Sequence, residues 1–268
     1  MAPASPVTTL SSAITLPDVR RTEQVALLSG AITLPAVRRI EAEIGAGATT
    51  LVVDSGGGDE DAALELAAEI QRRKLTVVAV RTCFSACASY VLAASPAREV
   101  RGVTLIGFHH TSTALLLTAE ARSSTPAPLL AQLRRRAAEE RQLYQAAGLD
   151  LRLLTDPLYD LRPVCAWSSM ETVLVGPSDW IPDQALLARY HYVIAGGAPA
   201  SVSSFIQRYG AEVVTKPGDF RERDGQSFIQ PESVQVRAVF EHLPDCPPQL
   251  QGLNPPGAEV DPAPGGGP

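Results

Sequence analysis

Ser85 is the residue of this chain whose setting best suits a nucleophile. It lies in "VRTCFSACASYVLAAS", residues 80–95, between Cys83 and Cys87. The apolar run before it predicts a buried strand, and the small residues after it predict a helix. Free N–H groups in the first turn of that helix could hold the oxyanion that forms when a carbonyl is attacked. A serine that only caps the helix is the simpler alternative.

A serine nucleophile needs a base, and His109 is the predicted one. The chain has four histidines, and two of them, His109 and His110, end the strand-like stretch "IGFHH". Parallel strands that end at one edge of a sheet bring such positions together. The 24 positions from Ser85 to His109 accommodate one helix and one returning strand. His110 would point to the opposite strand face, so we predict a structural role for it.

A glycine triplet supplies the third candidate element. Gly56, Gly57 and Gly58 lie in "DSGGGDEDA", between a predicted strand and a predicted helix. Without Cβ atoms, this backbone can approach a ligand closely. The stretch matches neither the phosphate-binding loop ending in Gly-Lys-Ser/Thr nor the GxGxxG dinucleotide pattern. It therefore predicts either a loop that offers N–H groups to a carbonyl or an ordinary strand-to-helix turn.

The four cysteines allow several arrangements. Cys83 and Cys87 lack a second ligand pair at a zinc-binding spacing, which argues against a metal site. A disulfide between them would require a short Cα separation around Ser85, and a regular helical turn lies near the upper limit for that separation. Small buried thiols that pack beside the helix are the alternative. A bridge between Cys165 and Cys246 is a further option that the sequence leaves open.

The elements that must position these residues alternate along the chain. This pattern predicts an α/β fold of repeated βαβ units, in which helices flank a mostly parallel sheet. The predicted strands are 25–30, 49–54, 75–82 and 103–109, and the predicted helices are 34–45, 59–73 and 85–95.

The remainder of the chain is predicted less regularly. Residues 111–128 read as a loop or insertion, and 128–148 as a long helix whose Arg and Glu residues form a solvated face. Residues 178–197, "SDWIPDQALLARYHYVIAGG", read as a loop, a short helix capped by Asp183 and a strand. The predicted divisions are an N-terminal arm (1–22), the main domain (23–196), a C-terminal extension packed on it (197–245) and a disordered tail rich in Pro and Gly (246–268).

The order strand–"SGGG"–helix, strand–"CFSACASYVL"–helix, strand–"IGFHH" resembles the Clp protease proteolytic subunit and its secreted bacterial relatives, within the crotonase-like superfamily. The resemblance covers about residues 25–194. It implies that Ser85 is the nucleophile and His109 the base. Gly57 and Gly58 match the paired glycines of the oxyanion loop, and the Ala86 N–H matches the second oxyanion donor.

The resemblance also implies an acidic third residue. Asp179 in "DWIPDQALLARYHYVI" is the preferred candidate, with Asp156 and Asp160 as rivals. A Ser–His pair could retain partial activity if other groups orient the imidazole.

Composition narrows the partners. The formal charge is -6, the pI about 5.3 and the aromatic content 5%, which argues against nucleic acid and anionic membranes. We predict no membrane span, because no apolar run reaches about 18 residues. The start of the chain lacks a signal pattern, and a removed signal would leave such a start. The likeness to secreted relatives favours a periplasmic or secreted location, with a cytoplasmic one left open.

The sequence thus predicts a serine peptidase-like hydrolase that acts on a peptide or protein, without metal or organic cofactor. Its relatives form rings or stacked assemblies, so the resemblance implies a homo-oligomer. Two alternatives remain at this point: a catalytically silent binding or scaffold protein of the same fold, and a crotonase-type acyl-CoA enzyme.

Overall fold

The computed structural model describes residues 24–120, 125–155 and 180–210, apart from the side chain of Thr118. It describes the backbone alone for 164–168, 171–175, 179, 220–223 and 226–229. The predicted arm (1–22) and tail (246–268) lie outside the described residues.

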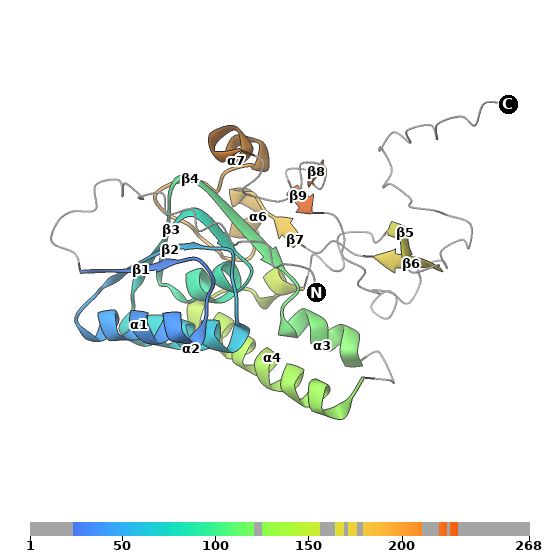
Figure 1. Ribbon diagram of the computed structural model, residues 1–268, viewed down its shortest axis with the longest axis horizontal. Coiled ribbons are helices and arrows are strands. Elements are labelled where there is room, and N and C mark those ends of the chain that lie inside the picture. The colour runs from blue at the N-terminus through green and yellow to red at the C-terminus, as the bar shows by residue number, and fades with distance from the viewer. Residues whose placement is uncertain are drawn as a thin grey trace, which may run out of the picture.

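The fold is built on a sheet whose first four strands are parallel (Figure 1). The short strand β7 then pairs antiparallel with β4, and the order across the sheet is β1-β2-β3-β4-β7-β9-β8. Strands β5 and β6 form a separate antiparallel pair. The strands are β1 (Val25–Ser29), β2 (Thr50–Ser55), β3 (Thr76–Phe84), β4 (Ala97–His109), β5 (Val164–Ser168), β6 (Glu171–Val175), β7 (Asp179–Ile181), β8 (Phe220–Arg223) and β9 (Gln226–Ile229).

Helices cover the parallel strands, as the alternating pattern predicts. In Figure 1, α1 and α2 lie side by side below the sheet, α4 runs beneath them beside α3, and α7 lies at the other side. The helical segments are α1 (Leu34–Gly45), α2 (Glu60–Arg73), the π-helical η1 (Cys87–Leu92), α3 (Ser112–Glu120), α4 (Ala127–Ala147), the 3-10 turn η2 (Leu151–Leu154), α6 (Gln184–Arg189) and α7 (Val202–Tyr209). The predicted α/β class with a mostly parallel sheet flanked by helices is confirmed.

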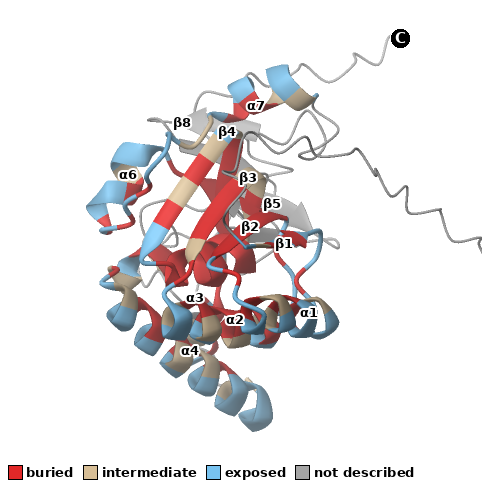
Figure 2. Cartoon of the chain, turned by 90° about the vertical axis from the view of Figure 1, so that its left-hand side faces the viewer, coloured by how far each residue is buried: buried red, intermediate tan, exposed pale blue. Residues whose placement is uncertain are grey.

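The helix that follows the glycine triplet begins and ends where its sequence indicates. Asp59 caps α2 by accepting a hydrogen bond from the Ala62 N–H at 2.8 Å. At the other end, Lys74 adopts a left-handed conformation with φ of 55°. Between these ends, one face of α2 packs into the core that Figure 2 shows in red. Because this cap fixes the start of α2, it also fixes the end of the glycine loop that joins β2 to α2.

Three expectations from the sequence are wrong. Residues 112–120 form helix α3 rather than a loop, and its first turn is held by the buried carboxyl of Glu140. Glu140 therefore does not belong to the solvated face of the long helix. After α6 the chain forms no strand in the described residues up to 210, and only Ala195 makes an isolated bridge, with Glu99. Within the predicted C-terminal extension, α7 packs on the sheet through Phe205.

Candidate active site

The predicted nucleophile occupies a sharp turn between β3 and the following helix. Ser85 has a φ of 57°, a left-handed conformation that costs a non-glycine residue about 1 to 3 kcal/mol. Its N–H donates to the Gly107 carbonyl at 2.9 Å, and its carbonyl accepts from the Ser89 N–H at 2.9 Å. The turn places the half-buried Ser85 at the end of the strand, as a nucleophile elbow does.

A second residue with a left-handed backbone, Arg81, lies in β3 shortly before this turn. Arg81 has a φ of 61°, and the pairing register of β3 shifts beside it against both neighbouring strands. Buried Asp54, the residue before Ser55 in β2, holds the shift in place. Its carboxylate lies 2.5 Å from the Arg81 guanidinium and accepts from the Thr82 hydroxyl at 2.7 Å. The end of β3 is thus fastened to the strand that leads into the glycine loop.

The structure brings the predicted nucleophile and base together. Ser85 Oγ and His109 Nε2 are hydrogen-bond partners. The other ring nitrogen of His109, Nδ1, lies 2.7 Å from the carbonyl oxygen of His110. A carbonyl oxygen only accepts, so Nδ1 carries the hydrogen, and in the neutral imidazole Nε2 is left as an acceptor. The Ser85 hydroxyl therefore donates to His109, which is the arrangement that a general base requires.

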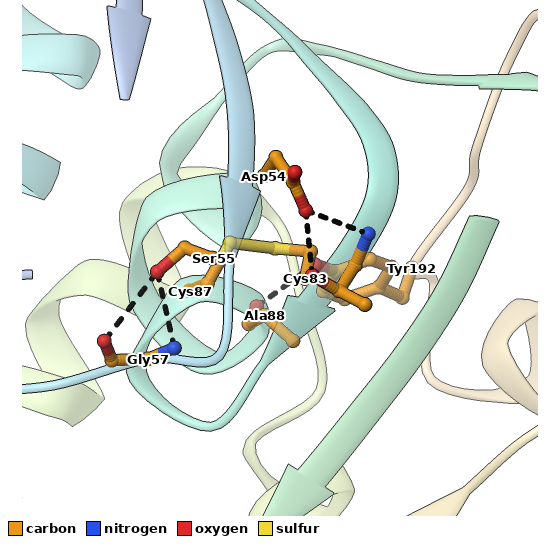
Figure 3. Close-up of a disulfide and its surroundings, with 8 residues drawn as sticks. Asp54, Ser55, Gly57, Cys83, Cys87, Ala88 and Tyr192 are labelled. Atoms are coloured by element: carbon orange, nitrogen blue, oxygen red, sulfur yellow. Dashed lines mark hydrogen bonds between the residues drawn. A yellow bond between two sulfur atoms is a disulfide. The ribbon is translucent and has the colours of Figure 1, made fainter. Parts of the chain in front are cut away.

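The glycine loop runs directly against Ser85. Gly57 has a φ of 97°, and a Cβ placed on it would lie 2.5 Å from Ser85 Cβ and 2.8 Å from Ser85 Oγ. The Ser55 hydroxyl accepts from the Gly57 N–H at 3.1 Å, which fixes the turn (Figure 3). On its far side the loop bonds to the segment before α1, where the Ile32 N–H donates to the Gly57 carbonyl at 2.8 Å.

Two N–H groups beside the serine remain available for a ligand. The Ile32 N–H donates to the Gly57 carbonyl, and the Ile32 carbonyl accepts from the Asp59 N–H. The Gly58 N–H, which lies between these two bonds, has no acceptor within the described residues. The Ala86 N–H, which follows Ser85 at the start of the helix, also lacks an acceptor in this part of the chain. These are the two groups that the sequence proposes as oxyanion donors. Free donors at a helix start are the usual means of stabilising an oxyanion.

A disulfide links the two cysteines that flank the serine (Figure 3). Cys83 and Cys87 have Cα atoms 5.2 Å apart, and both side chains are fully buried. Of the two arrangements that the sequence leaves open for these cysteines, the structure has the disulfide rather than the free thiols. The left-handed turn at Ser85 changes the chain direction between the two cysteines, so the spacing of a regular helical turn does not apply.

The helix that follows Ser85 is π-helical over Cys87–Leu92. Two backbone carbonyls of this helix and its C-terminal cap accept hydrogen bonds from side chains elsewhere in the chain. The Tyr192 hydroxyl donates to the Ala88 carbonyl at 2.8 Å (Figure 3). The buried Arg98 guanidinium donates to the Ala93 carbonyl at 2.8 Å and lies 5.2 Å from the centre of the Tyr192 ring. Burial lowers the pKa of Arg98. The helix carrying the nucleophile is thereby fixed at both ends.

The predicted acid, Asp179, stands opposite His109 in the antiparallel pairing of β4 and β7. Its side chain lies outside the described residues, as do Asp156 and Asp160. The contact that the structure describes at His109 Nδ1 is with the His110 carbonyl. The pattern of residue types gave no signal for this backbone acceptor, because any residue supplies a carbonyl.

The other predictions have mixed outcomes. Trp180, the residue after Asp179, is buried and packs against Phe108 with ring centres 5.4 Å apart. The proposed Cys165–Cys246 bridge is not described, because the side chain of Cys165 and all of Cys246 lie outside the described residues. Across the described ranges, no cluster of three or more His, Cys, Asp or Glu side chains is suited to a metal ion. No helix in these ranges combines the length and apolar character of a membrane span.

Comparison with known proteins gives no assignment: no family model and no curated protein matches this chain.

Proposed function

We propose that this protein is a serine hydrolase of the Clp protease type, acting on peptide bonds through Ser85 and His109. The observation that carries the proposal is the hydrogen bond from Ser85 Oγ to His109 Nε2, made at the strained turn that follows β3. A serine whose only role was to cap the helix would not require a left-handed backbone or an imidazole partner.

In the proposed reaction, His109 Nε2 takes the Ser85 proton while Oγ bonds to the carbonyl carbon of the substrate. The negative charge that develops on the carbonyl oxygen is held by the Gly58 and Ala86 N–H groups. The carbon–nitrogen bond then breaks as His109 returns the proton to the departing amine. Water, deprotonated by the same imidazole, hydrolyses the acyl-serine and restores the hydroxyl.

The tautomer of His109 favours this role. Because Nδ1–H donates to the His110 carbonyl, the lone pair of Nε2 faces Ser85. In a complete triad a carboxylate performs this orientation and also stabilises the imidazolium. A neutral carbonyl gives less stabilisation of that charge. We therefore expect turnover below that of a complete triad.

The test is hydrolysis of fluorogenic peptides by the wild type and by Ser85→Ala. The proposal predicts turnover that the substitution abolishes. If neither protein cleaves peptides or simple esters, the protein is a silent binding protein of this fold. Wild-type thermal stabilisation by CoA thioesters, with activity towards them unchanged in Ser85→Ala, would instead identify a crotonase-type acyl-CoA enzyme.

A further inference from the structure

Glu140 of α4 is a fully buried carboxyl group that the proposed reaction does not use. Three groups at the start of α3 donate to it. They are the Thr111 hydroxyl at 3.2 Å, the Ser112 N–H at 3.0 Å and the Thr113 N–H at 2.8 Å. A buried charge without partners would be strongly destabilising, and here both carboxyl oxygens are engaged.

The segment that Glu140 holds is continuous with the base of the site. Thr111 follows His110, whose carbonyl accepts the Nδ1–H of His109. If the turn at residues 111–113 shifts, the carbonyl that fixes the imidazole shifts with it. The backbone of His110 and Thr111 therefore connects the turn that Glu140 holds to the acceptor of the His109 Nδ1–H.

The same carboxyl group reaches the other two parts of the site through Tyr90. The Tyr90 hydroxyl lies in η1, five residues after Ser85, and is 2.6 Å from Glu140 and 2.7 Å from Glu60. Glu60 is the first residue of α2, directly after the glycine loop and Asp59. The Glu60–Tyr90–Glu140 cluster therefore joins the elements that carry the oxyanion loop, the nucleophile and the base.

The two short contacts of the Tyr90 hydroxyl are both hydrogen bonds only if the cluster holds one proton more than two carboxylates and one phenol supply. The Tyr90 hydroxyl has one hydrogen, yet its oxygen lies within bonding distance of two carboxyl groups. Both bonds form if Glu140 is protonated and donates to Tyr90, while Tyr90 donates to Glu60. Glu60 is the better anion, because the Arg136 guanidinium lies 3.0 Å from its other oxygen.

We propose that Glu140, as a neutral acid, is a positioning residue for the Ser85–His109 pair, holding the three elements of the site in register through Tyr90 and the 111–113 turn. This inference rests on the proposed hydrolase function.

Ionisation of Glu140 should loosen this arrangement. Burial, with a contribution from the nearby Glu60, raises the pKa of Glu140 to about 7. The charged or titratable groups around it are Glu60 from α2, Tyr90 from η1, and Arg136 and Tyr144 from α4. Above that pH a single phenol hydrogen is left between two carboxylates, and the link between η1 and the 111–113 turn weakens.

The experiment measures two properties of Glu140→Ala, Glu140→Gln and the control Glu139→Ala. The first is the rate at which a fluorophosphonate labels Ser85 between pH 5 and 9. The second is the ¹⁵N chemical shifts of the His109 imidazole, assigned with His109→Gln, which report the tautomer without any reaction. Glu139 is the matched control because it is the neighbouring acid on α4 but only partly buried, and it is paired with Arg135.

We expect Glu140→Ala to lose the Nδ1–H tautomer and to label on the order of 10- to 100-fold more slowly. Glu140→Gln, a permanently neutral side chain of the same size, can still donate to Tyr90 and accept from the Thr113 N–H, but its amide nitrogen cannot accept from the Ser112 N–H. It should therefore label more slowly than the wild type near pH 6, by a factor that does not arise from ionisation of residue 140. The ratio of the wild-type rate to the Glu140→Gln rate should then fall, on the order of tenfold, as the pH rises through about 7. Should Glu140→Ala fail to fold, this ratio still decides the matter.

Two failures can be told apart. If the wild type labels at Ser85 and both Glu140 variants behave like Glu139→Ala, with an unchanging rate ratio, the positioning role is refuted and the hydrolase function stands. If the wild type does not label but Glu140→Ala alters the imidazole shifts, the hydrolase function fails and the effect of Glu140 on His109 stands. Unaltered shifts in an unlabelled protein would refute both.

Discussion

A Cβ atom at position 57 would lie 2.8 Å from the hydroxyl oxygen of Ser85, because the backbone of Gly57 runs directly against that side chain. The glycine is therefore required twice, for its φ of 97° and for the space beside the serine.

Gly57→Ala should abolish the reactivity of Ser85 and lower the free energy of unfolding by about 1 to 3 kcal/mol. The adjacent Gly56→Ala is the matched control, since a Cβ at position 56 meets nothing within 4 Å. Chemical denaturation and fluorophosphonate labelling of both variants check this. Equal effects of the two substitutions would show that the loop is a simple turn.

The elements around the glycine loop are those that the sequence predicts. The strand before Ser55, the helix after Asp59 and the return of the chain through β3 and β4 follow from apolar periodicity and capping residues. Because parallel strands end at one edge, the meeting of Ser85 with His109 was predictable from element order.

The remaining features depend on geometry that residue types do not encode. The left-handed turn at Ser85 and the π-helix after it make the Cys83–Cys87 disulfide possible. The Cα separation across a regular helical turn would be unfavourable for this bond. Glu140 lies in the run "RRRAAEERQ", which reads as solvent-facing. Its partners Tyr90 and Thr111 come from distant parts of the chain, 50 and 29 positions away.

The disulfide should stabilise the fold modestly. Cys83 and Cys87 are separated by four positions, and closing so short a loop contributes about 2 kcal/mol. Replacing both by alanine should lower the free energy of unfolding by that amount and slow labelling of Ser85. Chemical unfolding with and without a reductant checks this. The reductant should lower the free energy of unfolding of the wild type to that of the double variant, and it should leave the double variant unchanged. A wild type indifferent to reduction would refute the prediction.

Tyr192→Phe should destabilise the helix that follows the nucleophile. The substitution removes the hydroxyl that donates to the Ala88 carbonyl and leaves that carbonyl buried without its partner, at a cost of about 1 to 3 kcal/mol. Tyr209→Phe is the control, since the Tyr209 hydroxyl forms no hydrogen bond within the described residues. Thermal and urea unfolding compare the two. The prediction fails if both substitutions cost the same.

Glu140 should impose a pH dependence on stability. Its pKa rises from 4.5 to about 7 on folding, so between these pH values the folded protein holds a proton that the unfolded chain has released. This contribution is fully present below pH 4.5 and is lost as the pH rises to about 7, amounting to about 3 kcal/mol.

The measurement is the difference in free energy of unfolding between the wild type and Glu140→Gln across this pH range. In this difference, the contributions of groups that titrate alike in both proteins cancel. The wild type should lose stability relative to the variant as the pH rises. A flat difference, or one of the opposite sign, would show that Glu140 is ionised in the folded protein throughout.

The most direct test of the central claim is covalent labelling with a fluorophosphonate, with the modified residue located by mass spectrometry. We expect one label per chain on Ser85 of the wild type, none on Ser85→Ala, and a rate reduced by about 100-fold or more in His109→Gln. A wild type that stays unlabelled, or whose label lies elsewhere and persists in Ser85→Ala, would contradict the claim that Ser85 and His109 form a nucleophilic pair.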